Sequence, residues 1–170
     1  AERAIADDPD YQPKVVTMQQ LETLRALVDR VIPQYGIDLA ARIDTQLATG
    51  EGDGWRFAVL PVDADAYRAG LDTLDALTDG AFAKLEGADR DALLHKIAAA
   101  DWSAAAPLTP EQMSLWFEDV RADAVRLWLA HPATMARVGY DGFATGGDGV
   151  RTQGYALTAA DEREGWEPAR

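Results

Sequence analysis

The sequence predicts a mainly α-helical single domain, and three observations lead to this prediction. Apolar residues recur at intervals of three and four, the period of an amphipathic helix, in several separate stretches. Two of these stretches open with a Thr-x-x-Gln capping box. The chain has 170 residues, 48% of them hydrophobic, which is enough to bury a core. We therefore expect a bundle of about five to six helices, with three parts along the chain: an extended arm over 1–16, a helical domain over 17–138 and an irregular tail over 139–170.

The first predicted helix begins at Thr17 and is stopped by Pro33. Thr17 and Gln20 form the capping box, in which each side chain satisfies a backbone N–H group of the first turn. Proline cannot continue the helix, and it disfavours helical geometry at Ile32. The apolar face of this helix comprises Leu21, Leu24, Val28 and Val31.

Two more helices are expected on either side of a glycine-rich loop. Residues 37–47 carry apolar side chains at i, i+4 and i+8, and Gly50 follows at a usual closing position. The loop over 51–61 contains Trp55 and Phe57. The third helix begins at Asp63 and is expected to continue to about residue 85. Its two internal glycines, Gly70 and Gly80, each cost about 1 kcal/mol relative to alanine, and close helix packing would explain them.

The last two helices of the predicted bundle are expected over 88–100 and from Thr109 to the region of Pro132. Thr109 and Gln112 form the second capping box, and Pro110 occupies the first helical position, where a missing N–H group is harmless. A broad apolar stripe follows, made of Met113, Trp116, Phe117, Val120, Ala124, Leu127 and Trp128.

Charge and composition exclude several classes of protein. The formal net charge is −13, whereas nucleic acids and anionic membranes are bound by basic surfaces. No apolar run approaches the roughly 20 residues that span a bilayer. Cysteine is absent, which excludes disulfides, thiolate metal sites and thiol nucleophiles. An acidic chain of this kind is compatible with docking on a basic protein surface.

Four stretches carry a family resemblance. LETLRALVDRVIP from Leu21, DAYRAGLDTLDAL from Asp65, AFAKLEGADRDALLHKI from Ala81 and WFEDVRADAVRLWLAHP from Trp116 occur in order. Together they resemble the helical core of the gluconate 2-dehydrogenase subunit 3 family. The C-terminal third departs from the commonest pattern of that family, an Asp-Pro-x-Tyr-Gly-Gly-Asn turn, because His131-Pro132 and Gly139-Tyr140-Asp141-Gly142 occur here instead. The departure leaves the substrate of any partner open.

The resemblance implies a small, non-catalytic subunit bound to a large FAD-dependent subunit of the glucose-methanol-choline type. In this family a c-type cytochrome often completes the complex, which oxidises sugars, polyols or glycosides. The small subunit usually carries a twin-arginine signal and escorts the large subunit to the periplasm. An N-terminal Ala1 fits either cleavage of a signal or removal of an initiator methionine. With the resemblance, we expect a periplasmic mature chain after signal cleavage, with no cofactor of its own and with FAD in the partner.

The sequence offers little chemistry of its own. Asp91 and His95 are four residues apart on one predicted helix face and could bind a metal, although a solvated pair is the ordinary interpretation. His131 is expected to hydrogen-bond near a helix end. The glycines over 146–149 lack the Lys-Ser/Thr of a phosphate-binding loop, and neither Ser103 nor Ser114 lies in a G-x-S-x-G motif. We therefore expect no catalytic, cofactor or metal residues.

Aromatic residues outside the predicted helices are the remaining candidates for a functional site. They either fold back onto the core or anchor a partner, since tryptophan and tyrosine are enriched at interface hot spots. The candidate interface residues are Tyr11, Trp55, Phe57, Tyr140, Phe143, Tyr155 and Trp166. Two other functions stay open from the residues alone, a free-standing helical binding domain and a small carboxylate/histidine metal enzyme.

Overall fold

The computed structural model describes residues 10–32, 36–50, 55–131 and 134. In these residues the chain forms α-helices and one short 3-10 helix, without any strand, so the predicted mainly α fold is confirmed. The elements are α2 (Met18–Val31), α3 (Leu39–Thr49), α4 (Asp63–Ala76), η1 (Phe82–Lys84), α5 (Gly87–Ala98) and α6 (Pro110–Ala130). None of the described helices is long and apolar enough to cross a membrane.

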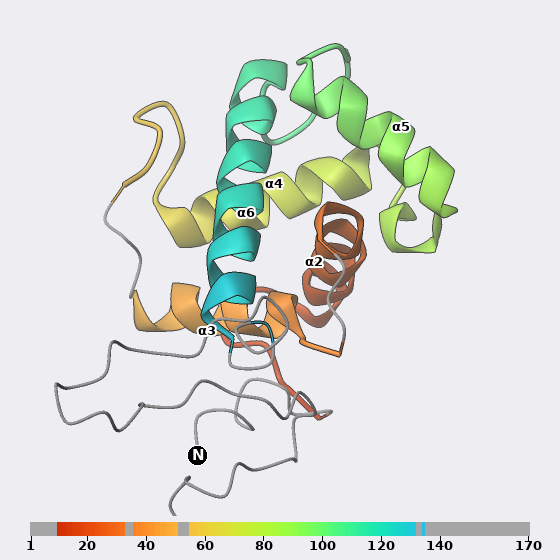
Figure 1. The fold of residues 1–170 in the computed structure, drawn as a ribbon. Coiled ribbons are helices and arrows are strands. Elements are labelled where there is room, and N and C mark those ends of the chain that lie inside the picture. The colour runs from red at the N-terminus through yellow and green to blue at the C-terminus, as the bar shows by residue number, and fades with distance from the viewer. Residues whose placement is uncertain (1–9, 33–35, 51–54, 132–133, 135–170) are drawn as a thin grey trace, which may run out of the picture.

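The longest helix, α6, organises the fold. It contacts α2, α3, α4 and α5, and Figure 1 shows it crossing in front of α4 with its C-terminal end beside α3. The two further views show α5 on the far side of the molecule from α3. The core between the helices contains large side chains with less than 2% exposure, among them Leu21, Leu24, Leu27, Leu39, Ile43, Leu71, Leu74, Phe82, Ile97, Met113 and Trp116.

Both predicted capping boxes are present. The Thr17 hydroxyl accepts a hydrogen bond from the Gln20 backbone N–H, and the Gln20 side chain accepts one from the Thr17 N–H. Thr109 and Gln112 make the same exchange at the start of α6. These polar exchanges satisfy donors that a helix start otherwise leaves open, and they fix where α2 and α6 begin.

The third predicted helix is shorter than expected, because α4 ends at Ala76 rather than near residue 85. Asp79 and Gly80 have φ angles of 51° and 74°, which is left-handed geometry that a right-handed helix cannot include. The Gly80 N–H donates to the Asp75 carbonyl at 2.7 Å and closes the turn. The chain then returns through η1, which places Phe82 in the core although the helix has ended.

The two glycines of this region have different roles. Gly70 lies in α4 directly against Trp116, and a Cβ at position 70 would be 2.2 Å from Cε2 of that ring. Close helix packing is therefore confirmed as the reason for Gly70. A Cβ at Gly80 would meet nothing within 4 Å, and its positive φ is the constraint there. The packing explanation is wrong for Gly80.

The second helix begins at Leu39, two residues later than predicted, and ends at Thr49. Asp38 caps it, since its side chain accepts the Ala41 N–H at 3.1 Å. Gly50 closes the helix with a φ of 68°, the left-handed conformation expected from the sequence.

Residues 10–16 contain no helix, yet they are tied to α3 by one buried carboxylate. Asp44 is fully buried and accepts the Tyr11 hydroxyl at 2.6 Å. It also accepts the backbone N–H groups of Lys14, Val15 and Val16 at 2.6, 3.0 and 2.9 Å. The negative charge is thereby stabilised by four donors. This part of the predicted arm consequently contributes to the core.

Candidate partner interface

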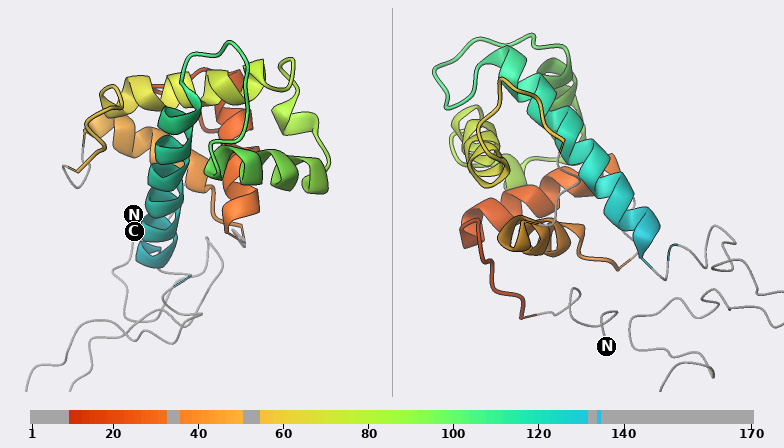
Figure 2. Two further views of the ribbon diagram at one scale, coloured as in Figure 1. Left: turned by 90° about the horizontal axis from the view of Figure 1, so that it is seen from above. Right: turned by 90° about the vertical axis from the view of Figure 1, so that its left-hand side faces the viewer.

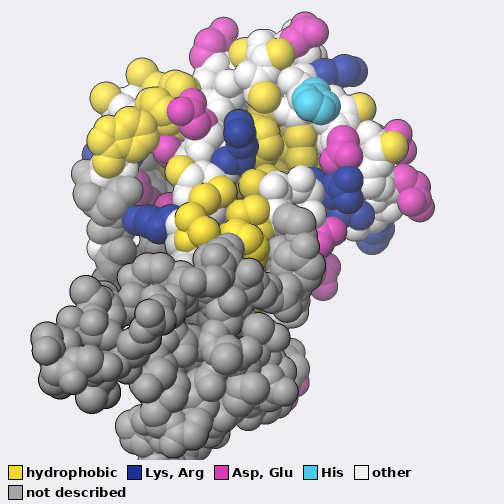
Figure 3. Space-filling view, in the orientation of Figure 1, with side chains coloured by type: hydrophobic (Ala, Val, Ile, Leu, Met, Phe, Trp, Pro, Cys, Tyr) yellow, Lys and Arg dark blue, Asp and Glu magenta, His cyan; other side chains and the backbone are white. Residues whose placement is uncertain are grey.

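The loop between α3 and α4 presents the most exposed large apolar side chains of the described chain. Trp55 is 62% exposed, Val59 59% and Val62 53%. Figure 3 shows hydrophobic side chains gathered at upper left, where Figure 1 places this loop. Three large apolar side chains are thus more than half exposed within eight positions of the chain, whereas exposed apolar residues usually occur singly.

Contacts within the loop and with the start of α6 fix the conformation of the loop that carries Trp55. Leu60 is buried, and its N–H donates to the Phe57 carbonyl at 3.0 Å. The Gln112 side chain at the start of α6 donates to the Val59 carbonyl at 2.8 Å. The Trp55 and Phe57 rings meet edge to face, with centroids 4.6 Å apart. These contacts reduce the freedom that Trp55 would lose on binding.

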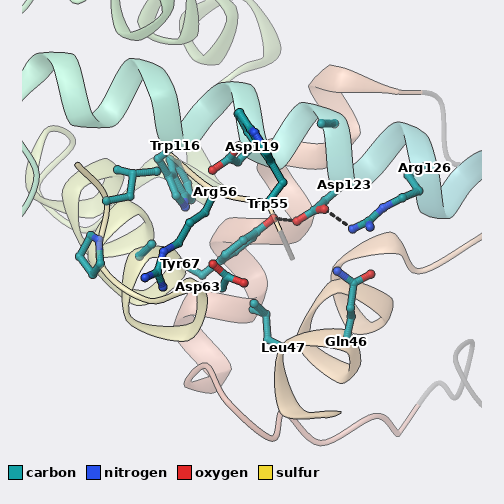
Figure 4. A pocket seen from close by; sticks show the side chains of 14 residues that line it. Gln46, Leu47, Trp55, Arg56, Asp63, Tyr67, Trp116, Asp119, Asp123 and Arg126 are labelled. Atoms are coloured by element: carbon teal, nitrogen blue, oxygen red, sulfur yellow. Dashed lines mark hydrogen bonds and ion pairs between the residues drawn. The ribbon is translucent and has the colours of Figure 1, made fainter. Parts of the chain in front are cut away.

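A small pocket lies beneath this loop, between α3, α4 and α6 (Figure 4). Trp116 and Tyr67 form aromatic walls, with ring centroids 6.0 Å apart. The charged side chains that line it are Arg56, Asp63, Asp119, Asp123 and Arg126. The cavity volume is about 70 Å³, whereas small-molecule sites usually measure roughly 300–1,000 Å³. The pocket therefore accommodates a few waters or the tip of a side chain, and neither a sugar nor a flavin.

A hydrogen-bonded network closes one side of the pocket. The Tyr67 hydroxyl donates to Asp123 at 2.6 Å, and Arg126 pairs with the other oxygen of the same carboxylate. Burial raises the pKa of Tyr67 well above its ordinary value, and the nearby Asp123 charge raises it further. The phenol thus remains a proton donor to Asp123. The network is a structural link between α4 and α6, because each member is engaged by another.

Asp91 and His95, the candidate metal pair, occupy a different surface. The Arg30 guanidinium donates to both oxygens of Asp91 at 2.8 Å, and this hydrogen bonding holds the pKa of Asp91 below its usual range. The groove that contains His95 is also lined by Arg30 and Arg121. Two guanidinium groups disfavour a cation there. Within the described ranges, no cluster of three or more His, Cys, Asp or Glu side chains could hold a metal ion.

The candidate interface residues divide into three groups. Trp55 lies exposed on the loop, and Phe57 is half-buried beneath it. The prediction that Tyr11 belongs to the partner interface is corrected, because Tyr11 is only 8% exposed and lies in the chain's own core. The physical reason is the hydrogen bond that the Tyr11 hydroxyl donates to the buried Asp44 carboxylate, which draws this part of the predicted arm against α3. The remaining candidates, Tyr140, Phe143, Tyr155 and Trp166, lie outside the described residues, as do the glycines over 146–149.

Other predicted residues have structural positions. His131 is buried at the C-terminal cap of α6, and its backbone N–H donates to the Trp128 carbonyl at 3.2 Å. Trp116 is 1% exposed, as the apolar stripe predicts, and Trp128 is partly buried against the core. Ser114 donates to the Ala98 carbonyl and so links α6 to the end of α5.

Sequence reasoning missed several exposed apolar residues. Val59 and Val62 follow the two loop aromatics in the sequence, and this proximity to Trp55 was the available signal. Val125 and Leu129 are 40% and 46% exposed on α6. They are four residues apart on α6 and lie off the predicted apolar stripe, so the pattern of the buried face did not mark them.

Comparison with known proteins identifies the family. The family model described as gluconate 2-dehydrogenase subunit 3 matches residues 18–147. The chain belongs to the gluconate 2-dehydrogenase subunit 3 family. No curated protein and no solved structure matched the sequence. For this subunit 3 chain, the matched region includes all the described helices, the Trp55 loop and the pocket beneath it.

Proposed function

We propose that this subunit 3 chain is the non-catalytic accessory subunit of an FAD-dependent dehydrogenase complex. Its partner is a large glucose-methanol-choline-type subunit, which binds FAD and oxidises a sugar, polyol or glycoside. The observation that carries the proposal is the family match over 18–147.

The role of such a subunit is stabilisation of the large one. A large apolar docking surface left bare on the flavoprotein favours aggregation. A partner that binds only the folded state stabilises it by mass action, by about 4 kcal/mol when free partner is at 1,000 times the dissociation constant. The proposed contribution of this chain is therefore a higher yield of folded, FAD-loaded partner.

The complex is proposed to act in the periplasm. In this scheme the small subunit carries the twin-arginine signal and escorts the folded large subunit through the inner membrane, and a c-type cytochrome subunit can accept the electrons. This part of the proposal rests on the family alone.

Co-expression tests the proposal. The flavoprotein encoded nearest to this chain is produced alone and together with it, and soluble FAD-loaded enzyme is measured in cytoplasmic and periplasmic fractions. We expect exported, flavin-loaded protein only from co-expression. Equal export and flavin content from the large subunit alone would contradict the escort role. A chain that remains a stable monomer in the presence of the flavoprotein would instead support a free-standing binding domain.

A further inference from the structure

The exposed loop and the neighbouring acidic pocket form one surface, which we call the Trp55 face. It comprises the exposed side chains of Trp55, Val59 and Val62 together with Asp63 and Asp119, which line the adjoining pocket. Figure 4 shows the side chain of Trp55 and both carboxylates around the same cavity. We propose that the Trp55 face is the surface that docks on the large flavoprotein subunit, in an apolar depression with a basic rim. This inference rests on the proposed function.

The apolar part of this surface has the character of an anchor. Trp55 is a large ring, more than half exposed, on a loop whose backbone is fixed through Leu60 and Gln112. Hot spots are enriched in tryptophan, and a preorganised side chain loses less entropy on binding. Val59 and Val62 extend the contact on the same loop.

The charges of the pocket and of the whole chain indicate what kind of partner surface would dock on the Trp55 face. The pocket is lined by three carboxylates, those of Asp63, Asp119 and Asp123, and by two guanidinium groups, so negative groups outnumber positive ones. The chain as a whole has a net charge of −13. A second copy of this chain or an anionic membrane would be repelled by that charge. The charges favour a partner surface that places lysine or arginine around the depression that receives Trp55.

The test measures binding of the full-length chain to the flavoprotein encoded nearest to it, by surface plasmon resonance. Trp55→Ala is expected to weaken binding about 30-fold or more, the effect of a hot-spot residue. The matched control is Met18→Ala, which truncates an apolar side chain 42% exposed at the start of α2. It is expected to bind like the wild type. The melting temperature of each isolated variant verifies that folding is unchanged.

A second pair of variants tests the charge and the loop independently. Asp63→Asn combined with Asp119→Asn is expected to weaken binding about tenfold and to reduce its salt dependence, because basic partner groups lose their counter-charges. Val62→Asp is expected to weaken binding comparably to Trp55→Ala. Wild-type affinity in both Trp55→Ala and Val62→Asp would overturn the Trp55 face while the proposed function stood. Failure of the wild-type chain to bind any flavoprotein partner would overturn both.

Discussion

The indole of Trp116 occupies the space that a side chain at position 70 would need. A Cβ built on Gly70 would lie 2.2, 2.4 and 2.6 Å from three atoms of that ring. The absence of a side chain thus lets α4 and α6 approach each other, and Tyr67 one turn earlier donates to Asp123 across the same contact. Tyr67 and Trp116, from the two helices of this contact, also line the pocket beneath the Trp55 loop.

Gly70→Ala should therefore lower the free energy of unfolding. Alanine gains about 1 kcal/mol of helix propensity, but overpacking typically costs about 1–3 kcal/mol, and a 2.2 Å approach forces the indole to move. We expect a net loss, measured by urea denaturation. In a double-mutant cycle with Trp116→Phe, the smaller ring should recover part of the loss, with a coupling of about 0.5–3 kcal/mol. Additive effects would show that the two residues do not crowd each other.

Asp44→Asn should destabilise the fold through the segment over 10–16. Asparagine removes the negative charge and replaces one of the two accepting oxygens with an NH₂ group, which faces donors and cannot accept from them. Hydrogen bonds to a charged group contribute about 1.5–3 kcal/mol, and this contribution is reduced. We expect a loss of about 2–3 kcal/mol by urea denaturation and faster proteolysis near Lys14. Asp101→Asn, at an exposed carboxylate after α5, is the control. A variant at Asp44 as stable as that control would refute the anchoring role.

Tyr11 should make stability depend on alkaline pH. Burial and then the hydrogen bond to Asp44 raise the pKa of Tyr11 to about 12, above the unfolded value of about 10. A group whose pKa is raised on folding stabilises the native state below its unfolded pKa, and this contribution is lost as the pH rises through the folded value. The stability advantage of the wild type over Tyr11→Phe should hold at pH 9 and decline between pH 10 and 12. An advantage constant across that range would contradict the assigned environment.

Substitution of Trp116 should lower the stability of the chain, whereas substitution of Trp55 should weaken partner binding. Trp116→Ala removes a ring that is 1% exposed, and we expect a cost of about 3–5 kcal/mol. Trp55→Ala removes a ring that is 62% exposed, so its melting temperature should stay close to that of the wild type while partner binding weakens. Differential scanning fluorimetry of the isolated variants provides the comparison. Equal losses in melting temperature would remove the distinction between core and surface.

The sequence was most informative where local rules decide the structure. The capping boxes at Thr17 and Thr109, the apolar face of α2 and the closing glycine at Gly50 all follow from interactions within about four residues. Trp55 was one of several candidate interface aromatics because it stands in a glycine-rich loop, but the sequence did not decide between exposure and packing against the core. The spacing of apolar residues also predicted too long a helix for α4, because spacing does not reveal the left-handed turn at Asp79 and Gly80.

The rest depends on contacts between distant parts of the chain. Asp44 accepts hydrogen bonds from the backbone N–H groups of Lys14, Val15 and Val16, which precede it by 30, 29 and 28 positions. Nothing adjacent to Asp44 in the sequence therefore marks it as buried. Tyr67 and Asp123 are 56 positions apart and are brought together only by the crossing of α4 and α6. Such pairs require the tertiary arrangement, which periodicity does not specify.

If this chain works as a bound subunit, it must purify as part of a complex that contains the flavoprotein. The chain is affinity-tagged, co-expressed with its neighbouring flavoprotein and analysed by size-exclusion chromatography with detection of protein and of flavin absorbance near 450 nm. We expect one peak that contains both chains and FAD, and loss of that peak when Trp55→Ala is combined with Val62→Asp. Elution of the wild-type chain alone, with all flavin in a separate peak, would show that the chain is not a subunit of the flavoprotein complex.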